Sequence, residues 1–390
     1  MDVALARWLV SEAARPHLER AAQEADPSSL AAATRLRRDL SGDQAAAVLD
    51  QVALRSRAHA KLGESAERLF FTRDGLEQAT RWAVARWRAD RLRRAGAVEL
   101  TEAAAGLGID ALAGLEAGLT VRAIERDPVT AVLAQANLGP GATVLTGSAE
   151  TLVDPAELCA RPDQALFCDP SRRTARGRSW EVADLSPSWA QLAAWLDQAT
   201  GPVVYKLAPG LPHRLLPAGV QAVWVSHDGD LVETGLWRGP DWPVDRRLAV
   251  RLPQGETVAA GPPTPPAGPL GRWLWEPDPA VIRSGALGAV AESLEAHPVA
   301  DQIAYLTGSA DRRSPFATRF EILEVLPART KQVRAWAAAA GVGALEIKQR
   351  GLDLDPAQWR KQLKLKGSAQ ASLICAPSPS GPLALVTRRD

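Results

Sequence analysis

Residues 99–128 read ELTEAAAGLGIDALAGLEAGLTVRAIERDP. This segment predicts a short strand, a glycine-containing loop, a helix, and a second strand that ends at Glu125. Glycines let the backbone approach a ligand closely, and the N-terminus of the helix offers unpaired N–H groups. An acidic side chain at the end of the following strand can hold both hydroxyls of a ribose. The segment therefore predicts a ligand site in an α/β domain.

Strand-like segments alternate with helical ones after this point. An Asp-Gly pair, Asp228 and Gly229, separates the last two apolar runs and predicts a hairpin. The alternation predicts a mostly parallel sheet. The further strands are expected within residues 143–147, 165–170, 202–209, 221–229 and 231–239.

Changes in composition predict four segments. Ala, Leu, Arg and Glu dominate the N-terminal segment, which predicts helices there. A later segment is rich in Pro and Gly, which predicts a linker. We expect a helical domain at 1–95, an α/β core at 96–252, a Pro/Gly-rich linker with a connecting helix at 253–300, and a small α+β domain at 301–390.

Composition excludes several classes of protein. The 390 residues carry a net charge of +1, and 46% are hydrophobic, as expected for a globular protein with a real core. Three cysteines lie far apart and five histidines are scattered, so we expect neither a disulfide scaffold nor a metal site. No apolar run reaches the ~18 residues of a membrane span, and the N-terminus resembles an amphipathic helix more than a signal peptide. We expect a cytoplasmic enzyme or binding protein.

The glycine loop fits two kinds of ligand. Gly106-x-Gly108-x-x-Ala111 fits a dinucleotide fingerprint, which would indicate a nicotinamide-dependent oxidoreductase. A pyrophosphate is repelled by a nearby carboxylate, however, and Glu102 precedes Gly106 by four residues. A ligand with an ammonium, a sulfonium and a ribose but no phosphate suits this loop better. We therefore favour S-adenosylmethionine, and the oxidoreductase is the weaker alternative.

The sequence CDPSRR, residues 168–173, follows the fourth expected strand. Ligands of open α/β sheets bind at the carboxyl ends of the strands, so Asp169 and Pro170 should face the same crevice as the glycine loop. An aspartate there can accept a hydrogen bond from an amine, which suits methylation of an amino group. Arg172 and Arg173 could clamp a phosphate of the substrate.

These motifs resemble those of bacterial class I methyltransferases that carry a C-terminal THUMP-like domain. The resemblance extends over most of the chain, since further segments match as well. It implies a seven-stranded, Rossmann-like α/β core that binds S-adenosylmethionine, an N-terminal helical domain, and a small α+β THUMP-like domain. The additional matching segments are LFFTRDGLEQAT (69–80), YKLAPG (205–210), VSHDGDLVETGLW (225–237), WEPDPAVIRSG (275–285), ALEIKQRG (344–351) and KLKG (364–367).

Some positions depart from the pattern of the family. Glu102 stands where an Asp is usual, Ile109 where a further Gly is common, and Ser148 where an Asp often contacts the adenine amine. DPSRR replaces the D/N-P-P-aromatic motif of amino methyltransferases and lacks its stacking ring, for which Trp180 could substitute. A more distant similarity, to RNA cap guanine-N2 methyltransferases, implies that Thr80, with Phe71 and Thr72, lies over the methionine end of the cofactor. The residues expected to bind the cofactor are Thr80, Glu102, Gly106, Gly108, Asp110, Glu125, Arg126, Ser148 and Ala149.

The C-terminal ninety residues carry a net positive charge. They contain 14 Lys/Arg against 8 Asp/Glu, a net charge of +6 in a chain whose total is +1. Trp359 lies among these cations, and a stacking ring between phosphate-pairing cations suits RNA. THUMP domains are RNA-binding modules, so the resemblance implies an RNA partner, tRNA or rRNA. The expected RNA-binding residues in this region are Lys348, Arg350, Arg360, Lys361, Lys364 and Lys366.

The function predicted from the sequence is therefore methyl transfer from S-adenosylmethionine to an amino nitrogen of a base in structured RNA. Asp169 and Pro170 are the expected catalytic residues. An RNA-binding protein whose methyltransferase fold is weakly active or inactive remains as the alternative.

Overall fold

A computed structural model describes residues 1–24, 26–27, 29–172, 184–378 and 381–390. The chain divides into two compact units. Unit 1 comprises Met1–Gln221 and Glu233–Asp245, and unit 2 comprises Ala222–Val232 and Arg246–Asp390. Among the described residues, no helix is both long enough and apolar enough to cross a membrane.

Unit 1 begins with helices, as the sequence predicts. Capping explains several of their N-termini: the Ser41 side chain accepts from the backbone N–H of Gln44, and the Gln44 side chain accepts from that of Ser41. Leu9, Leu18, Leu36 and Val48 are buried where these helices pack together. The helices are α1 (Val3–Leu9), α2 (Arg15–Ala22), α3 (Leu30–Leu36), α4 (Gly42–Leu62), α5 (Arg73–Gln78) and α6 (Trp82–Arg94).

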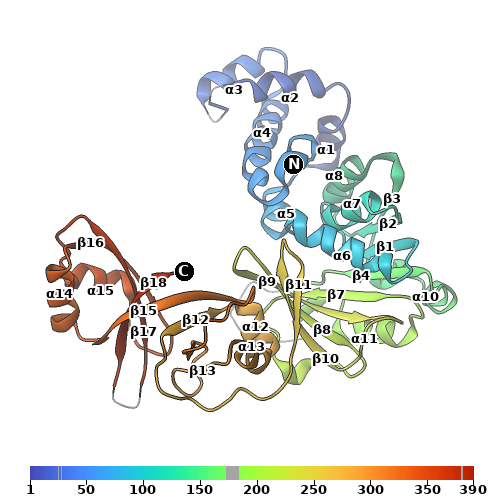
Figure 1. The fold of residues 1–390 in the computed structure, drawn as a ribbon. Coiled ribbons are helices and arrows are strands. Elements are labelled where there is room, and N and C mark those ends of the chain that lie inside the picture. Colours follow the sequence, from blue (N-terminus) through green and yellow to red (C-terminus); the bar gives the residue numbers. More distant parts are fainter. Residues whose placement is uncertain (25, 28, 173–183, 379–380) are drawn as a thin grey trace. The chain divides into compact units, whose positions relative to one another are not determined.

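A mostly parallel sheet follows in unit 1. Its strands lie in the order β3-β2-β1-β4-β7-β9, and only β9 runs antiparallel to its neighbour β7. Figure 1 shows α6 and α7 over one face of these strands and α11 over the other. The elements are β1 (Glu99–Ala103), α7 (Ile109–Glu116), β2 (Thr120–Glu125), α8 (Pro128–Leu138), β3 (Ala142–Thr146), α9 (Ala149–Leu152), α10 (Pro155–Ala160), β4 (Gln164–Cys168), β5 (Ser171–Arg172), β6 (Leu185–Ser186), α11 (Trp189–Gln198), β7 (Val203–Leu207) and β9 (Asp230–Arg238).

The sheet is larger than the sequence predicts. Among the described residues, its order is β11-β10-β8-β9-β7-β4-β1-β2-β3, nine strands instead of seven. The strands β8 (Gln221–His227), β10 (Arg246–Leu252) and β11 (Glu256–Ala259) complete it. The expected Asp-Gly hairpin joins β8 to β9, with Asp228 and Gly229 both at positive φ. Strand β11 lies inside the Pro/Gly-rich segment that composition alone marked as a linker.

Unit 2 contains a second sheet in the order β13-β14-β12-β15-β18-β17-β16. Its neighbouring strands run antiparallel except for β16 and β17, which are parallel. One apolar core of this sheet includes Val333 and Ala337 from α14 and Trp359 and Leu363 from α15. The elements are β12 (Trp273–Pro277), α12 (Pro279–Ser284), α13 (Leu287–Leu294), β13 (His297–Pro298), β14 (Leu306–Gly308), β15 (Ala317–Pro327), α14 (Thr330–Ala339), β16 (Val342–Gln349), α15 (Pro356–Leu363), β17 (Ala369–Ala376) and β18 (Leu383–Arg389).

One buried cation joins three elements of unit 1. Arg88 of α6 donates to both carboxylate oxygens of Glu233 in β9, at 2.6 Å each, and also pairs with Asp110 of α7. Its guanidinium lies 4.4 Å from the centre of the Phe167 ring in β4. Burial alone would lower the pKa of Arg88, but Asp110 and Glu233 together raise it above its usual value. The arginine is therefore a permanent charge held by two carboxylates.

We expect Arg88→Met to lower the free energy of unfolding by about 3–5 kcal/mol, because Asp110 and Glu233 would remain as buried charges without their partner. Urea unfolding followed by tryptophan fluorescence measures this. Arg86→Met is the matched control, since Arg86 lies on the same helix but is exposed, and it should change the value by less than about 0.5 kcal/mol. Equal stability of the two variants would contradict the prediction.

Candidate functional site

The strand order reverses direction between β1 and β4, and this is where open α/β sheets bind ligands. Strand β1 continues to β2 on one side, whereas β4 continues to β7 on the other. The carboxyl ends of β1 and β4 carry Glu102 and Asp169, the two acidic residues that the sequence places in one crevice. The candidate site therefore lies at the carboxyl edge of the sheet, beside the point where the strand order reverses.

The glycine loop after β1 has an open, strained backbone. Ala104, Gly106 and Gly108 all adopt positive φ, at 63°, 55° and 75°. A Cβ built on Gly106 would meet nothing within 4 Å, so this part of the loop faces open space. A Cβ on Gly108 would lie 3.2 Å from Leu138. Any side chain at Gly106 would enter this open space, and it would also strain the backbone.

Glu125, the last residue of β2, contacts the glycine loop through its side chain. Its carboxylate accepts hydrogen bonds from the backbone N–H groups of Gly106, at 2.8 Å, and Asp127, at 2.7 Å. Burial raises the pKa of Glu125, while these two backbone donors oppose that rise. Each carboxylate oxygen retains a second lone pair that can accept from a hydroxyl.

Helices α5 and α8 hold the loop in place. The side-chain amide of Asn137 donates to the carbonyls of Phe70 and Leu107, each at 3.0 Å. A Cβ on Gly75 would lie 2.8 Å from the Leu107 side chain, so α5 needs this glycine to pack so closely. The segment around Phe71, which the resemblance placed near the cofactor, therefore packs against the glycine loop.

Glu102, near the end of β1, is a buried acidic residue. Only 2% of the residue is exposed, and within the described part of the chain its Oε2 atom has no hydrogen-bond partner. Burial is the main cause that raises the pKa of Glu102 well above its usual value; nearby Asp110 adds to it, whereas Arg88 and the Ala111 backbone N–H oppose it. An unsatisfied carboxyl at this depth is costly unless a ligand supplies a donor.

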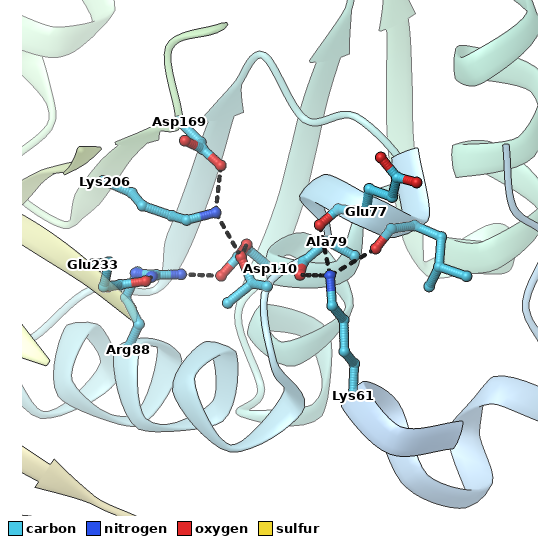
Figure 2. Close-up of polar contacts among 10 residues, drawn as sticks. Lys61, Glu77, Ala79, Arg88, Asp110, Asp169, Lys206 and Glu233 are labelled. Carbon is cyan, nitrogen blue, oxygen red and sulfur yellow. Dashed lines mark hydrogen bonds and ion pairs between the residues drawn. The ribbon is translucent and has the colours of Figure 1, made fainter. Parts of the chain in front are cut away.

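A chain of polar contacts links the Arg88 cluster to Asp169 (Figure 2). Thr80 donates to Asp110 at 2.6 Å, and the ammonium of Lys206 donates to Thr80 at 3.1 Å. Lys206 also pairs with Asp169. Thr80 and Asp110 are nearly buried, whereas Asp169 is partly exposed. Asp110, expected to bind the cofactor, thus contacts Arg88 and Thr80 in this structure.

Lys61 of α4 holds the segment that leads to Thr80. Its ammonium donates to the carbonyls of Leu76, at 2.8 Å, and Glu77, at 2.6 Å, near the C-terminus of α5 (Figure 2). Burial is the main cause that lowers the pKa of Lys61. A cation at the C-terminus of a helix satisfies orphan carbonyls and complements the helix dipole. Lys61 therefore fixes the position of the chain just before Thr80.

The other expected residues of unit 1 vary in their surroundings. Arg126 is exposed, Ser148 is the N-cap residue of α9, and Ala149 and Pro170 are buried. The backbone of Arg172 belongs to β5. Arg173 and Trp180 lie outside the described residues. Within the described ranges, no group of three or more His, Cys, Asp or Glu residues is arranged to hold a metal ion.

The expected RNA-binding residues of unit 2 fall into two groups. Lys348 and Arg350 both lie beside Glu276, so their charges are partly compensated. Arg360 is exposed and donates to the Leu345 carbonyl at 2.8 Å. The residues of a second group are exposed: Lys361, Lys364 and Lys366.

Trp359 was expected to stack on a base, and this is wrong. It is 6% exposed, and its indole N–H donates to Thr330 at 3.0 Å. The ring packs in the core with Leu363, because residues four apart share one face of a helix.

Sequence reasoning did not identify Arg88, Glu233 or Lys61. Arg88 is one of six arginines between residues 81 and 94, and only its burial distinguishes it. Glu233 carried a weak signal, as the only charged residue of the mostly apolar segment LVETGLW at 231–237. Lys206 was visible as a residue at a strand end, but its pairing with Asp169 was not.

Two family models match parts of the chain. A model described as THUMP domain-like matches residues 317–389, which include β15 to β18 with α14 and α15. A model of a domain of unknown function matches residues 2–58, within the N-terminal helices.

Similar whole chains are known as well. A crystal structure from Porphyromonas gingivalis W83 shares the fold, with a TM-score of 0.77 and 21% identity over 99% of this chain and 98% of that one. An uncharacterized S-adenosylmethionine-dependent methyltransferase of Mycobacterium tuberculosis, found in strains CDC 1551 / Oshkosh and ATCC 25618 / H37Rv, is 34% identical over 367 residues. That alignment covers 89% of this chain and 96% of the relative. With its glycine loop and acidic strand ends in the expected places, the chain belongs to this family of S-adenosylmethionine-dependent methyltransferases.

Proposed function

We propose that the protein methylates structured RNA, tRNA or rRNA. The observation that carries this proposal is the THUMP-like region in unit 2, which matches residues 317–389 and lies within the segment of net charge +6. THUMP domains bind RNA, and exposed lysines pair with phosphates.

The residues around the glycine loop fit S-adenosylmethionine. The unpartnered Oε2 atom of Glu102 offers an acceptor for the ammonium of its methionine part. Glu125 offers lone pairs to the ribose hydroxyls, and Gly106 leaves space beside them. When bound, the cofactor supplies an activated methyl group on a sulfonium. The other expected contacts, by Thr80, Gly108, Arg126, Ser148 and Ala149, are part of the same proposal.

Asp169 and Pro170 occupy the acceptor end of this proposed site. Asp169 is partly exposed, so its carboxylate can reach a substrate atom, whereas buried Pro170 fixes the turn. Asp169 would orient the acceptor and take up its proton. The sequence favours an amino nitrogen as acceptor. A protein that binds RNA without transferring methyl groups is the remaining alternative, and measured turnover would exclude it.

Glu125→Ala should weaken the binding of S-adenosylhomocysteine by about 1–3 kcal/mol, because charged hydrogen bonds to the ribose would be lost. Titration calorimetry measures this. Glu116→Ala is the control, since Glu116 is an exposed carboxylate at the C-terminus of α7, whereas the glycine loop precedes the N-terminus of that helix. If both folded variants bind equally well, Glu125 does not hold the ribose.

Binding of S-adenosylhomocysteine should release a proton from Glu102. Burial raises the pKa of Glu102 in the free protein, and a cationic ligand group lowers it again because it favours the carboxylate. Affinity should therefore rise with pH until the pH passes that raised pKa. Calorimetry in two buffers of different ionisation enthalpy measures the released proton, and Glu102→Gln is the control.

A smaller buffer dependence in Glu102→Gln than in the parent protein would support this assignment. Equal buffer dependence in both proteins, between about pH 5 and pH 8, would show that the proton comes from another group.

Replacing Lys361, Lys364 and Lys366 together by Ala should weaken RNA binding and lower the slope of log affinity against log salt by up to roughly 2–3 units. Each phosphate contact contributes about 0.7–0.9 to that slope. Affinity for S-adenosylhomocysteine should not change, since the glycine loop belongs to the other unit. An unchanged affinity and slope would show that these lysines are a solvated face.

A further inference from the structure

Lys206 is a cation at the acceptor end of the site that the amino-methylation model does not use. It belongs to β7, next to β4 in the sheet, and its side chain is 15% exposed. Its ammonium contacts Asp169 and Thr80. An ammonium has three N–H bonds and no acceptor. Because the described residues supply these two acceptors, a third N–H bond remains to be directed at a ligand.

The surrounding charges keep Lys206 protonated. Burial would lower its pKa, but Asp169, Asp110 and Glu233 together raise it, against the opposing effect of Arg88. Arg88 pairs with Asp110 and Glu233, so Asp169 is the carboxylate that directly compensates Lys206. The acceptor end therefore presents one fixed donor, the ammonium, beside one fixed acceptor, the carboxylate.

This pair is a poor match for an amino nitrogen on a base. Such a nitrogen has two N–H donors and a single lone pair, and that lone pair must attack the methyl group. An ammonium directed at the nitrogen would either face its N–H bonds or occupy the lone pair. Either arrangement slows transfer.

A hydroxyl oxygen matches the pair well. It donates its one hydrogen to Asp169, accepts from Lys206 with one lone pair, and keeps a second lone pair for the methyl group. Negative charge then develops on the oxygen as it loses its proton, and the ammonium stabilises that charge.

We propose that the acceptor atom is a hydroxyl oxygen of the RNA, a ribose 2′-hydroxyl, and that Lys206 and Asp169 act on it together. This inference rests on the proposed function. In the transfer, the oxygen–carbon bond forms as the carbon–sulfur bond breaks, and S-adenosylhomocysteine leaves. Asp169 takes the hydroxyl proton and passes it to water. Lys206 donates a hydrogen bond throughout and keeps its proton.

The chemical nature of the product tests the proposal. RNA from cells that lack the gene is incubated with the full-length protein and S-adenosylmethionine labelled in the methyl group, and is then hydrolysed with alkali. A 2′-O-methyl group blocks cleavage of the adjacent phosphodiester, so the label should appear in alkali-resistant dinucleotides. Label in mononucleotides alone would mean base methylation and would overturn this inference, while the RNA proposal would stand. If the protein binds S-adenosylhomocysteine but transfers no label to RNA, both the RNA proposal and this inference would be overturned.

Variants of Lys206 test its role. Lys206→Met should lower kcat by about 10²–10³-fold, the usual effect of removing one donor to a developing oxyanion. Lys206→Arg keeps the charge and should recover part of that loss. Lys331→Met is the control, since Lys331 is an exposed lysine of α14 outside the proposed RNA-binding residues.

Binding gives a readout that is independent of turnover. Lys206→Met leaves Asp169 without its cation, so the variant should prefer cationic S-adenosylmethionine over neutral-sulfur S-adenosylhomocysteine several-fold more than the parent does. If Lys206→Met keeps the kcat of the parent protein, or shows the same preference between the two ligands, then Lys206 does not have the proposed role in methyl transfer.

Discussion

The site depends on the buried pairing of Arg88 with Asp110 and Glu233. These residues come from α6, α7 and β9, which are far apart in sequence. Asp110 also accepts from Thr80, and Thr80 accepts from Lys206, which pairs with Asp169. The helix before the sheet, the helix after the glycine loop and the ends of two strands are thus joined by one series of polar contacts. A displacement of α6 would change both the stability of the core and the position of the acceptor end.

The same contacts set the charge that a ligand meets. Arg88 and Lys206 are opposed by Asp110, Asp169 and Glu233, so this cluster carries one excess negative charge (Figure 2). Glu102 adds another only when it is ionised. S-adenosylmethionine carries a sulfonium, an ammonium and a carboxylate, a net charge of +1. In the proposed site, the charge of the cluster is thus opposite to that of the cofactor before Glu102 ionises, and loss of the sulfonium charge after transfer would weaken the attraction.

The sequence predicts what depends on local pattern. The glycine loop, the acidic residues Glu102 and Glu125 at the strand ends, and the Asp228-Gly229 hairpin follow from spacing, because strands and turns impose it. The role of Arg88 does not, since the five arginines in its helix look alike until the fold buries one. The core position of Trp359 could have been found from Leu363 four residues later, a spacing that indicates one buried face. The pairing of Lys348 with Glu276 depends on two strands of a sheet whose order the sequence does not reveal.

Unit 2 separates its cations in a way that bears on where an anion binds. Arg272 and Arg388 pair with Glu321, Arg319 pairs with Asp311 and Asp390, and Lys348 pairs with Glu276. In the described part of the chain, no ion pair joins the lysines at 361, 364 and 366 to a carboxylate. They lie on the last turn of α15 and just beyond it, where the helix dipole already favours positive charge. A phosphate there gains the attraction of cations without displacing a carboxylate, but it also approaches the negative end of the helix. The proposed RNA binding at this surface should therefore depend mainly on the lysine side chains, which can extend away from the helix, and it should be sensitive to salt rather than to base sequence.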